Sequence, residues 1–188
     1  MNDDTAARVT EAMGFLVEAV EEIAPENWYR PSNLEGWEIP ELVAHVTGSA
    51  AKLVTLVEGG DGQEASQPDD LEYADRATQL RELADELQTA LAEADLDAMR
   101  SSPQGEVPLH EALRFPTFGL TIHAWDVYRS QARPVELPAD LLAFCQQVRD
   151  AVPDVELRRP GLFGAARIAP EDATPTIRLM AYLGRLVD

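Results

Sequence analysis

The sequence predicts an all-α protein, a bundle of four long helices with short helices at its C-terminal end. Apolar residues recur at steps of three and four positions in four long segments, the pattern of an amphipathic helix with one buried face. The segments between them are polar or contain proline and glycine, which end helices. A chain of 188 residues can bury one full hydrophobic core, so we expect residues 1–188 to form a single domain.

The first two helices are predicted over residues 5–23 and 39–58. Pro25 and Pro31 separate them, and Pro40 can begin the second because the first turn of a helix has no internal N–H donor to lose. The apolar face of the first helix comprises Val9, Met13, Leu16, Val17 and Val20.

A third and a fourth helix are predicted after a polar linker. Residues 59–68 are rich in Gly, Asp, Gln and Ser, so we expect an exposed linker there, followed by a helix over residues 68–95. Residues 101–105 are expected to form a turn. The fourth helix then runs from about residue 108 to residue 132.

Shorter elements are predicted for the C-terminal part. Residues 138–151 and 176–187 have the apolar spacing of short amphipathic helices. Residues 155–169 contain proline, glycine and scattered apolar residues, which indicates an irregular loop or a short hairpin. Cys145 is the only cysteine and lies among apolar residues, so we interpret it as a small buried side chain and expect no intramolecular disulfide and no cysteine-based zinc site.

The charge balance excludes two classes of partner. The chain has 34 acidic and 15 basic residues, a net charge of −19, which repels nucleic acids and anionic lipid surfaces. No run approaches the roughly 18 apolar residues of a membrane-spanning helix. The acidic N-terminus lacks the basic start and apolar core of a secretory signal, so we expect a cytoplasmic protein.

Two predicted helices carry a cluster of chemically active residues. His123, Trp125 and Asp126 lie within one turn of the otherwise apolar fourth helix, and His45 lies on the second helix. We hypothesise that the two histidines converge on one site, because bundles build ligand and metal sites from side chains that face each other across the core. Imidazole suits zinc, nickel or iron, but a catalytic metal needs a third protein ligand. Gly119, four residues before His123, has no side chain to offer.

Asp126 is the remaining candidate for the third ligand. It follows His123 by three residues and so shares its helical face, where it can complete a metal site with His45 and His123 or can orient His123 through its ring N–H. His123 and Asp126 are therefore the candidate catalytic residues, as an acid–base pair if no metal binds. The alternative that the histidines are structural, with hydrogen bonds to backbone or carboxylate groups, stays open.

Substrate contacts are predicted from aromatic residues and arginines near the cluster. The candidate walls for a flat or apolar ligand are Trp37, Phe118, Trp125 and Tyr128. Tryptophans in such positions are also typical of a core. Arg114 and Arg129 can pair with a carboxylate of the substrate, because the guanidinium fork matches carboxylate geometry, or with the acidic residues of the chain itself.

Residues 28–48 resemble a family signature. They fit the pattern W-x-x-P-S-x-x-x-G-W-x-x-x-x-L-x-x-H-x-x-G of the mycothiol-dependent maleylpyruvate isomerase N-terminal family, in the DinB/YfiT-like superfamily. Residues 123–126 resemble its second signature, H-x-W-D, and residues 159–164 and 177–185 are similar to the C-terminal segment of short, single-domain actinobacterial members.

The resemblance implies a DinB-type bundle of four helices in up-down-down-up order, with a divalent metal at one end of its core. In metal-binding members, one ligand is a histidine on the second helix, and His45 matches this position. The last ligand is a histidine on a later helix, and His123 matches that position. The middle ligand falls on Gly119, where this chain departs from the family pattern.

Two functions of different class follow. The first is a metal-assisted isomerase or transferase that acts on a small organic substrate with mycothiol as co-substrate, in which zinc or nickel lowers the pKa of the thiol. The alternative is a metal-free bundle that uses the same pocket as a small-ligand binding protein or a biosynthetic cyclase, which Gly119 favours. A role in partner binding alone also stays open. Association of two copies of the chain into a homodimer stays open as well.

Overall fold

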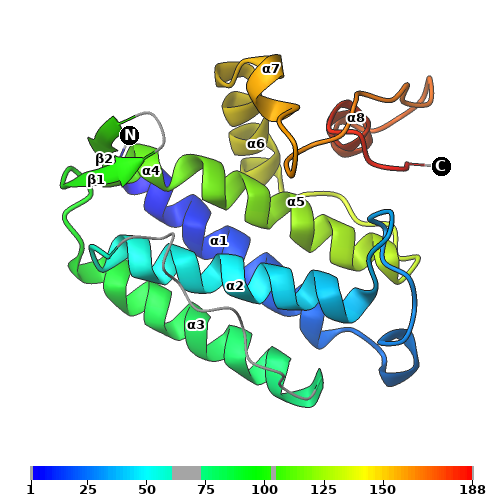
Figure 1. Cartoon of the computed structure of the whole chain (residues 1–188), viewed down its shortest axis with the longest axis horizontal. Coiled ribbons are helices and arrows are strands. Elements are labelled where there is room, and N and C mark those ends of the chain that lie inside the picture. Colours follow the sequence, from blue (N-terminus) through cyan, green and yellow to red (C-terminus); the bar gives the residue numbers. More distant parts are fainter. Residues whose placement is uncertain (1, 61–72, 103–104, 188) are drawn as a thin grey trace.

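Four long helices build the core of the protein (Figure 1). They are α1 (Asn2–Glu21), α2 (Ile39–Val57), α3 (Tyr73–Glu93) and α5 (Arg114–Ser130), in a computed structural model that describes residues 2–60, 73–102 and 105–187. Helices α1 and α2 each pack against both α3 and α5. In Figure 1, α1 and α5 run in one direction and α2 and α3 in the opposite one. The predicted all-α bundle and its up-down-down-up order are confirmed.

The two helices predicted first lie within three residues of their expected bounds, and α2 has a clear start. Val9, Met13, Leu16 and Val20 on α1 are at most 2% exposed, as the core-facing side of an amphipathic helix should be. Helix α2 begins with a capping box, in which the N–H of Glu38 donates to the Glu41 carboxylate at 2.8 Å and the Glu38 side chain accepts from the N–H of Glu41. A short 3₁₀ turn, Pro25–Asn27, and the buried Trp28 close the end of α1.

The linker and the third helix are only partly described. The predicted linker over 59–68 and the predicted helix start at residue 68 lie largely outside the described residues. The described helix α3 ends at Glu93, close to the predicted end at residue 95.

A β-hairpin follows α3, where the sequence predicts only a turn. Strands β1 (Met99–Ser102) and β2 (Gly105–Pro108) pair antiparallel, with Met99 opposite Pro108. Both strands are short and largely exposed, so they lack the alternation of apolar and polar residues from which a strand is predicted.

The predicted fourth helix is divided near its start. Helix α4 (Leu109–Ala112) is separated from α5 by Leu113, whose backbone is still helical. Pro116 explains the break, because it has no N–H to donate to the carbonyl of Ala112.

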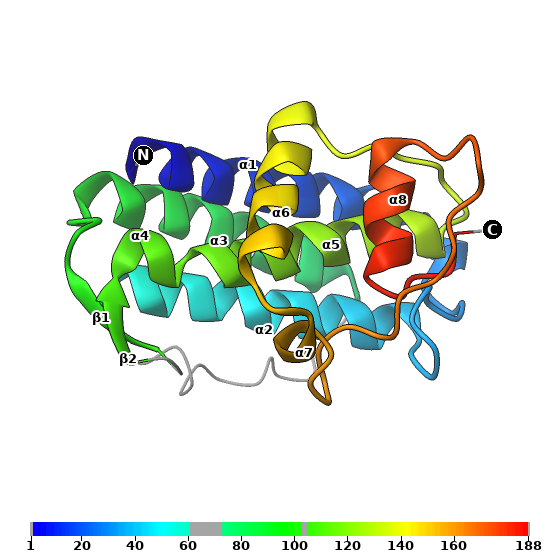
Figure 2. The same ribbon diagram turned by 90° about the horizontal axis from the view of Figure 1, so that it is seen from above.

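Three short helices cover one side of the bundle (Figure 2). They are α6 (Ala139–Ala151), α7 (Asp154–Leu157) and α8 (Pro175–Tyr182). Helix α6 packs against α1 and α5, and α8 packs against α6. Of the two predictions for residues 155–169, the irregular loop is confirmed and the hairpin is wrong, since these described residues contain the end of α7 and no strand. No helix of the described residues has the length and apolarity that crossing a membrane requires.

Candidate functional site

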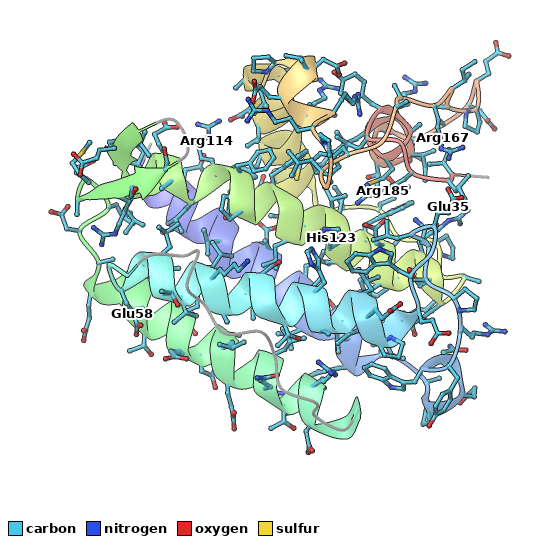
Figure 3. All side chains as sticks on the ribbon, in the orientation of Figure 1. Glu35, Glu58, Arg114, His123, Arg167 and Arg185 are labelled. Carbon is cyan, nitrogen blue, oxygen red and sulfur yellow. The ribbon has the colours of Figure 1, made fainter. Side chains whose placement is uncertain are left out.

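The two histidines of the predicted cluster lie together between α2 and α5, where Figure 3 shows His123. The centroids of the His45 and His123 rings are 5.0 Å apart, and the ring planes are nearly perpendicular, at 84°. The indole of Trp37 stands edge-on to His45, with the ring centroids 5.2 Å apart. The His123 side chain is 19% exposed and His45 is open to solvent, so both rings can be reached from outside.

Asp126 is fully buried, and three side chains hold its carboxylate. Arg185 donates from Nε to Oδ1 at 3.0 Å and from Nη2 to Oδ2 at 2.8 Å, which makes a bidentate ion pair. Nδ2 of Asn33 donates to Oδ1 at 3.2 Å, and Nδ1 of His123 lies 3.1 Å from Oδ2. Arg185 is 7% exposed, so the ion pair is shielded from water.

These partners keep Asp126 ionised and fix the tautomer of His123. Burial alone would raise the pKa of the Asp126 carboxyl, but the charge of Arg185 and the hydrogen bond with His123 outweigh burial and lower the pKa below its ordinary value. An ionised carboxylate only accepts hydrogen bonds, so a neutral His123 carries its proton on Nδ1. Nε2 of His123 is then the atom that can accept a proton from a bound molecule.

The loop between α1 and α2 places Trp37 against His45. Pro31 and Glu38 form an isolated antiparallel bridge across the loop, just before α2 begins. Gly36 has a φ of +81°, in the left-handed region that favours glycine, so the turn before Trp37 depends on a residue without a side chain.

The same loop is tied to α5. The backbone N–H of Asn33 donates to Oγ of Ser130 at 2.8 Å, and Ser130 donates to the carbonyl oxygen of Asp126 at 2.6 Å. With the bond from the Asn33 side chain to Asp126, these contacts join the two sequence signatures into one structural unit.

A tight turn near the C-terminus, where Figure 3 shows Arg185, brings this residue to Asp126. Gly184 has a φ of +82°, and a Cβ at this position would lie 2.8 Å from the backbone of Gly164, so a larger residue does not fit. Nε of Arg167 donates to the carbonyl oxygen of Gly184 at 2.9 Å and fixes the turn from the other side.

His45 is a neutral imidazole at neutral pH. One side of the His45 ring packs against the neighbouring rings and loses water there. This partial desolvation, together with the positive charges of His123 and Lys52, lowers the pKa of His45 from 6.5 to about 4. His45 can therefore donate one hydrogen bond and accept another at neutral pH.

The depressed pKa of His45 predicts a loss of stability in mild acid. Between about pH 6.5 and pH 4 the unfolded chain binds a proton at His45 and the folded chain does not, so the free energy of unfolding falls as the pH falls through this range. The variant His45→Gln should lose less stability than the parent chain between about pH 7 and pH 5. Urea denaturation at the two pH values measures this difference, and equal losses in both proteins would contradict the assignment.

Of the aromatic residues predicted to line the site, Trp37 is the one that lies there. Phe118 and Trp125 are at most 1% exposed and Tyr128 is 4% exposed, so all three belong to the core. Trp125 follows His123 by two residues and Phe118 precedes it by five, which turns their side chains about 200° and about 140° away around the helix. The predicted role of these three residues as walls is therefore corrected to core packing.

Of the two predicted arginines, Arg114 lies away from the histidines. Arg114 precedes His123 by nine residues, about 13.5 Å along α5 and on its opposite side. It lies 3.9 Å from the carboxylate of Glu111, and Figure 3 shows it far from His123. Arg129 follows His123 by six residues, about 9 Å along the helix, and is half-buried. Arg114 therefore does not adjoin the histidine pair, and the predicted role of Arg129 stays a prediction.

Comparison with known proteins agrees with the fold and its signatures. Residues 9–128 match the Mycothiol maleylpyruvate isomerase N-terminal domain family. The chain belongs to this family. Two solved structures share the fold, the mycothiol-dependent maleylpyruvate isomerase and a mutant of it in which a histidine is replaced by alanine. Each has a TM-score of 0.60 and 18% sequence identity over 77% of this chain and 67% of the other. No curated protein matches the sequence.

The metal that the family resemblance implies does not fit the donor set of this maleylpyruvate isomerase family member. Across residues 2–60, 73–102 and 105–187, no group of three or more His, Cys, Asp or Glu side chains could hold a metal ion. His45 and His123 supply two donors, and a Cβ built on Gly119 would meet no atom within 4 Å. Both oxygens of Asp126 are engaged by Arg185, whose charge repels a second cation. These contacts favour the second predicted role of Asp126, orientation of His123, over metal ligation.

Three site residues were missed by sequence analysis, namely Arg185, Asn33 and Ser130. Arg185 is the only charged residue in the apolar stretch 179–187, and Asp126 is the only one in the stretch 115–128. A lone charge within an apolar helical pattern predicts a buried ion that needs a partner. That signal was available, although it does not say which residue is the partner.

Two further features lie apart from the histidine pair. Cys145 is fully buried as predicted, and burial raises the pKa of its thiol to about 12, although a hydrogen bond with Thr121 opposes the shift. A solvent-open hollow on the outer face of α3 is lined by Asp85, Thr89 and Glu93 among others. Neither feature combines a base with a reactive group.

Proposed function

We propose that the chain is a mycothiol-dependent isomerase or transferase of a small organic substrate, in which His123 is the base that activates the thiol. The observation that carries the proposal is the buried Asp126–Arg185 pair that fixes the tautomer of His123 beside His45. Membership of the maleylpyruvate isomerase family supports the thiol as co-substrate. The proposal does not include the three-ligand metal centre, because the donor set does not fit one.

His123 can carry out the proton transfer that a thiol requires. A free thiol has a pKa of about 8.5, so only a few per cent is the reactive thiolate at neutral pH. Nε2 of His123 accepts the S–H proton while its Nδ1–H stays bonded to Asp126, which orients the ring and stabilises the imidazolium. Because Arg185 already compensates much of the charge of Asp126, the carboxylate contributes more to orientation than to basicity.

The thiol, when bound, supplies a nucleophile that adds to the conjugated double bond of the substrate and leaves again after rotation about the resulting single bond. His123 holds the thiol proton at Nε2 during this cycle and returns it to the sulfur, so no proton is lost. Neutral His45 can donate a hydrogen bond to the substrate carbonyl oxygen, which receives the electron pair of the double bond. Trp37 provides an apolar wall beside His45.

The test is turnover of maleylpyruvate by protein purified without a metal-affinity tag. We expect isomerisation that requires mycothiol and is not supported by an alcohol analogue of mycothiol that lacks the sulfur. Absence of isomerisation and of thiol transfer to any electrophile would contradict the proposal. Binding of maleylpyruvate without turnover would favour the alternative function, a small-ligand binding protein.

A further inference from the structure

The segments of α2 and α5 that face each other contain almost no carboxylates, although the chain has a net charge of −19. Residues 42–57 of α2 contain no Asp or Glu. Asp126 is the only acidic residue among residues 115–128 of α5, and it is 0% exposed and paired with Arg185. A protein with 34 acidic residues repels anionic molecules over most of its surface, so these two helix segments, which add no exposed carboxylate, are a place where an anion can approach.

Lys52, the only lysine of the chain, lies in the α2 segment. It follows His45 by seven residues, so it lies two turns along the same side of α2. Its side chain is exposed, and no ion pair or hydrogen bond joins it to another described residue. Arg81, by contrast, is held by the carboxylate of Glu21. Within residues 2–60, 73–102 and 105–187, nothing occupies the three N–H donors of the Lys52 ammonium.

Gly119 leaves room between this cation and the histidines. Helices α2 and α5 pack against each other and run antiparallel, so the residues that precede His123 on α5 lie beside those that follow His45 on α2 (Figures 1 and 2). Measured along the helix axes, Gly119 lies about 6 Å from His123 on α5. Lys52 lies about 10.5 Å from His45 on α2, in the same direction. A Cβ on Gly119 would meet nothing within 4 Å. The open space thus lies between the two histidines and the level of Lys52.

We propose that Lys52 binds a carboxylate of the substrate beside Gly119 and so directs the reacting part of the substrate toward His123. This inference rests on the proposed function for the chemistry at His123, but the binding of an anion by Lys52 can be measured without turnover. The flexible four-carbon stem of lysine can span the distance along the helix axes between the level of Lys52 and that of Gly119. The carboxylate that Lys52 binds lies about one to two helical turns, roughly 5–10 Å, from the carbon that reacts.

The experiment compares Lys52→Met, Lys52→Arg and Arg114→Met with the parent chain. Methionine keeps an unbranched stem but removes the charge, arginine keeps the charge, and Arg114 is the rival cation that lies away from the histidines. Isothermal titration calorimetry with maleate as the carboxylate probe, without thiol, measures binding. We expect Lys52→Met to weaken binding about ten- to hundredfold, as for the loss of one charge-assisted hydrogen bond, and Lys52→Arg to restore most of it.

The outcomes separate this inference from the proposed function. Maleate binding that depends on Lys52 supports the inference even if no isomerisation is found. In a catalytically active protein, Lys52→Met should raise KM for the acid by a similar factor and change kcat little, and it should leave KM for the corresponding neutral amide unchanged. Equal maleate binding by the parent and Lys52→Met, no binding by either, or a loss confined to Arg114→Met would overturn it.

Discussion

Replacement of Arg185 by alanine is expected to lower the free energy of unfolding by about 3–5 kcal/mol, a large share of the stability of a domain of this size. The guanidinium is 7% exposed and makes a bidentate pair with Asp126, which is 0% exposed. Its removal leaves a buried carboxylate with only Asn33 and His123 as partners. The loss arises mainly from this uncompensated charge rather than from the missing contact itself.

Urea denaturation of Arg185→Ala, Asp126→Ala and the double variant measures the effect. The double variant should lose clearly less than the sum of the single losses, because the second substitution removes the charge that the first leaves unpaired. Arg133→Ala is the matched control, since Arg133 pairs with Glu22 at the surface, where both side chains are more than a third exposed, and should lose at most about 1 kcal/mol. Similar small losses for Arg133→Ala and Arg185→Ala would show that the buried pair does not organise the site.

Replacement of His123 by alanine is expected to lower kcat/KM for the thiol-dependent reaction by about 10²- to 10⁴-fold, the usual contribution of a general base. The fold should survive, because the His123 side chain is partly exposed and Arg185 continues to hold Asp126. Initial rates at saturating mycothiol, with circular dichroism as a check on folding, measure the effect.

His110→Ala provides the control for the loss of a histidine. Nδ1 of His110 lies 3.0 Å from the carbonyl oxygen of Leu96, next to the hairpin and about 20 Å along the helix axis from His123. Its replacement should leave the rate unchanged. An equal decline in both variants would mean that the loss reflects general damage to the protein and not the chemistry of His123.

The sequence alone predicted the helical bundle and the approach of His45 to His123, because both depend on local patterns. Helical periodicity placed α1, α2 and α5, and the two signatures placed His45 and His123 on helices that face each other. The same periodicity could have assigned Phe118 and Trp125 to the core, since neither is three or four residues from His123.

The partner of Asp126 could not be predicted in the same way. Arg185 lies 59 residues later, after a short helix that the sequence predicts with a longer span, and it reaches Asp126 because Gly184 allows a close approach to Gly164. Such a contact follows from tertiary packing and leaves no periodic trace in the sequence. It also changed the interpretation of Asp126, which has no oxygen left for a metal.

We propose that His123, oriented by Asp126, takes the proton of the thiol without a three-ligand metal centre. The most direct measurement is the ultraviolet absorbance of the thiolate when mycothiol is added at neutral pH to chelator-treated protein, with residual metal determined by elemental analysis. We expect a thiolate signal with the parent chain and none with His123→Ala. A signal that appears only after zinc or nickel is restored, or that is the same in His123→Ala, would contradict it.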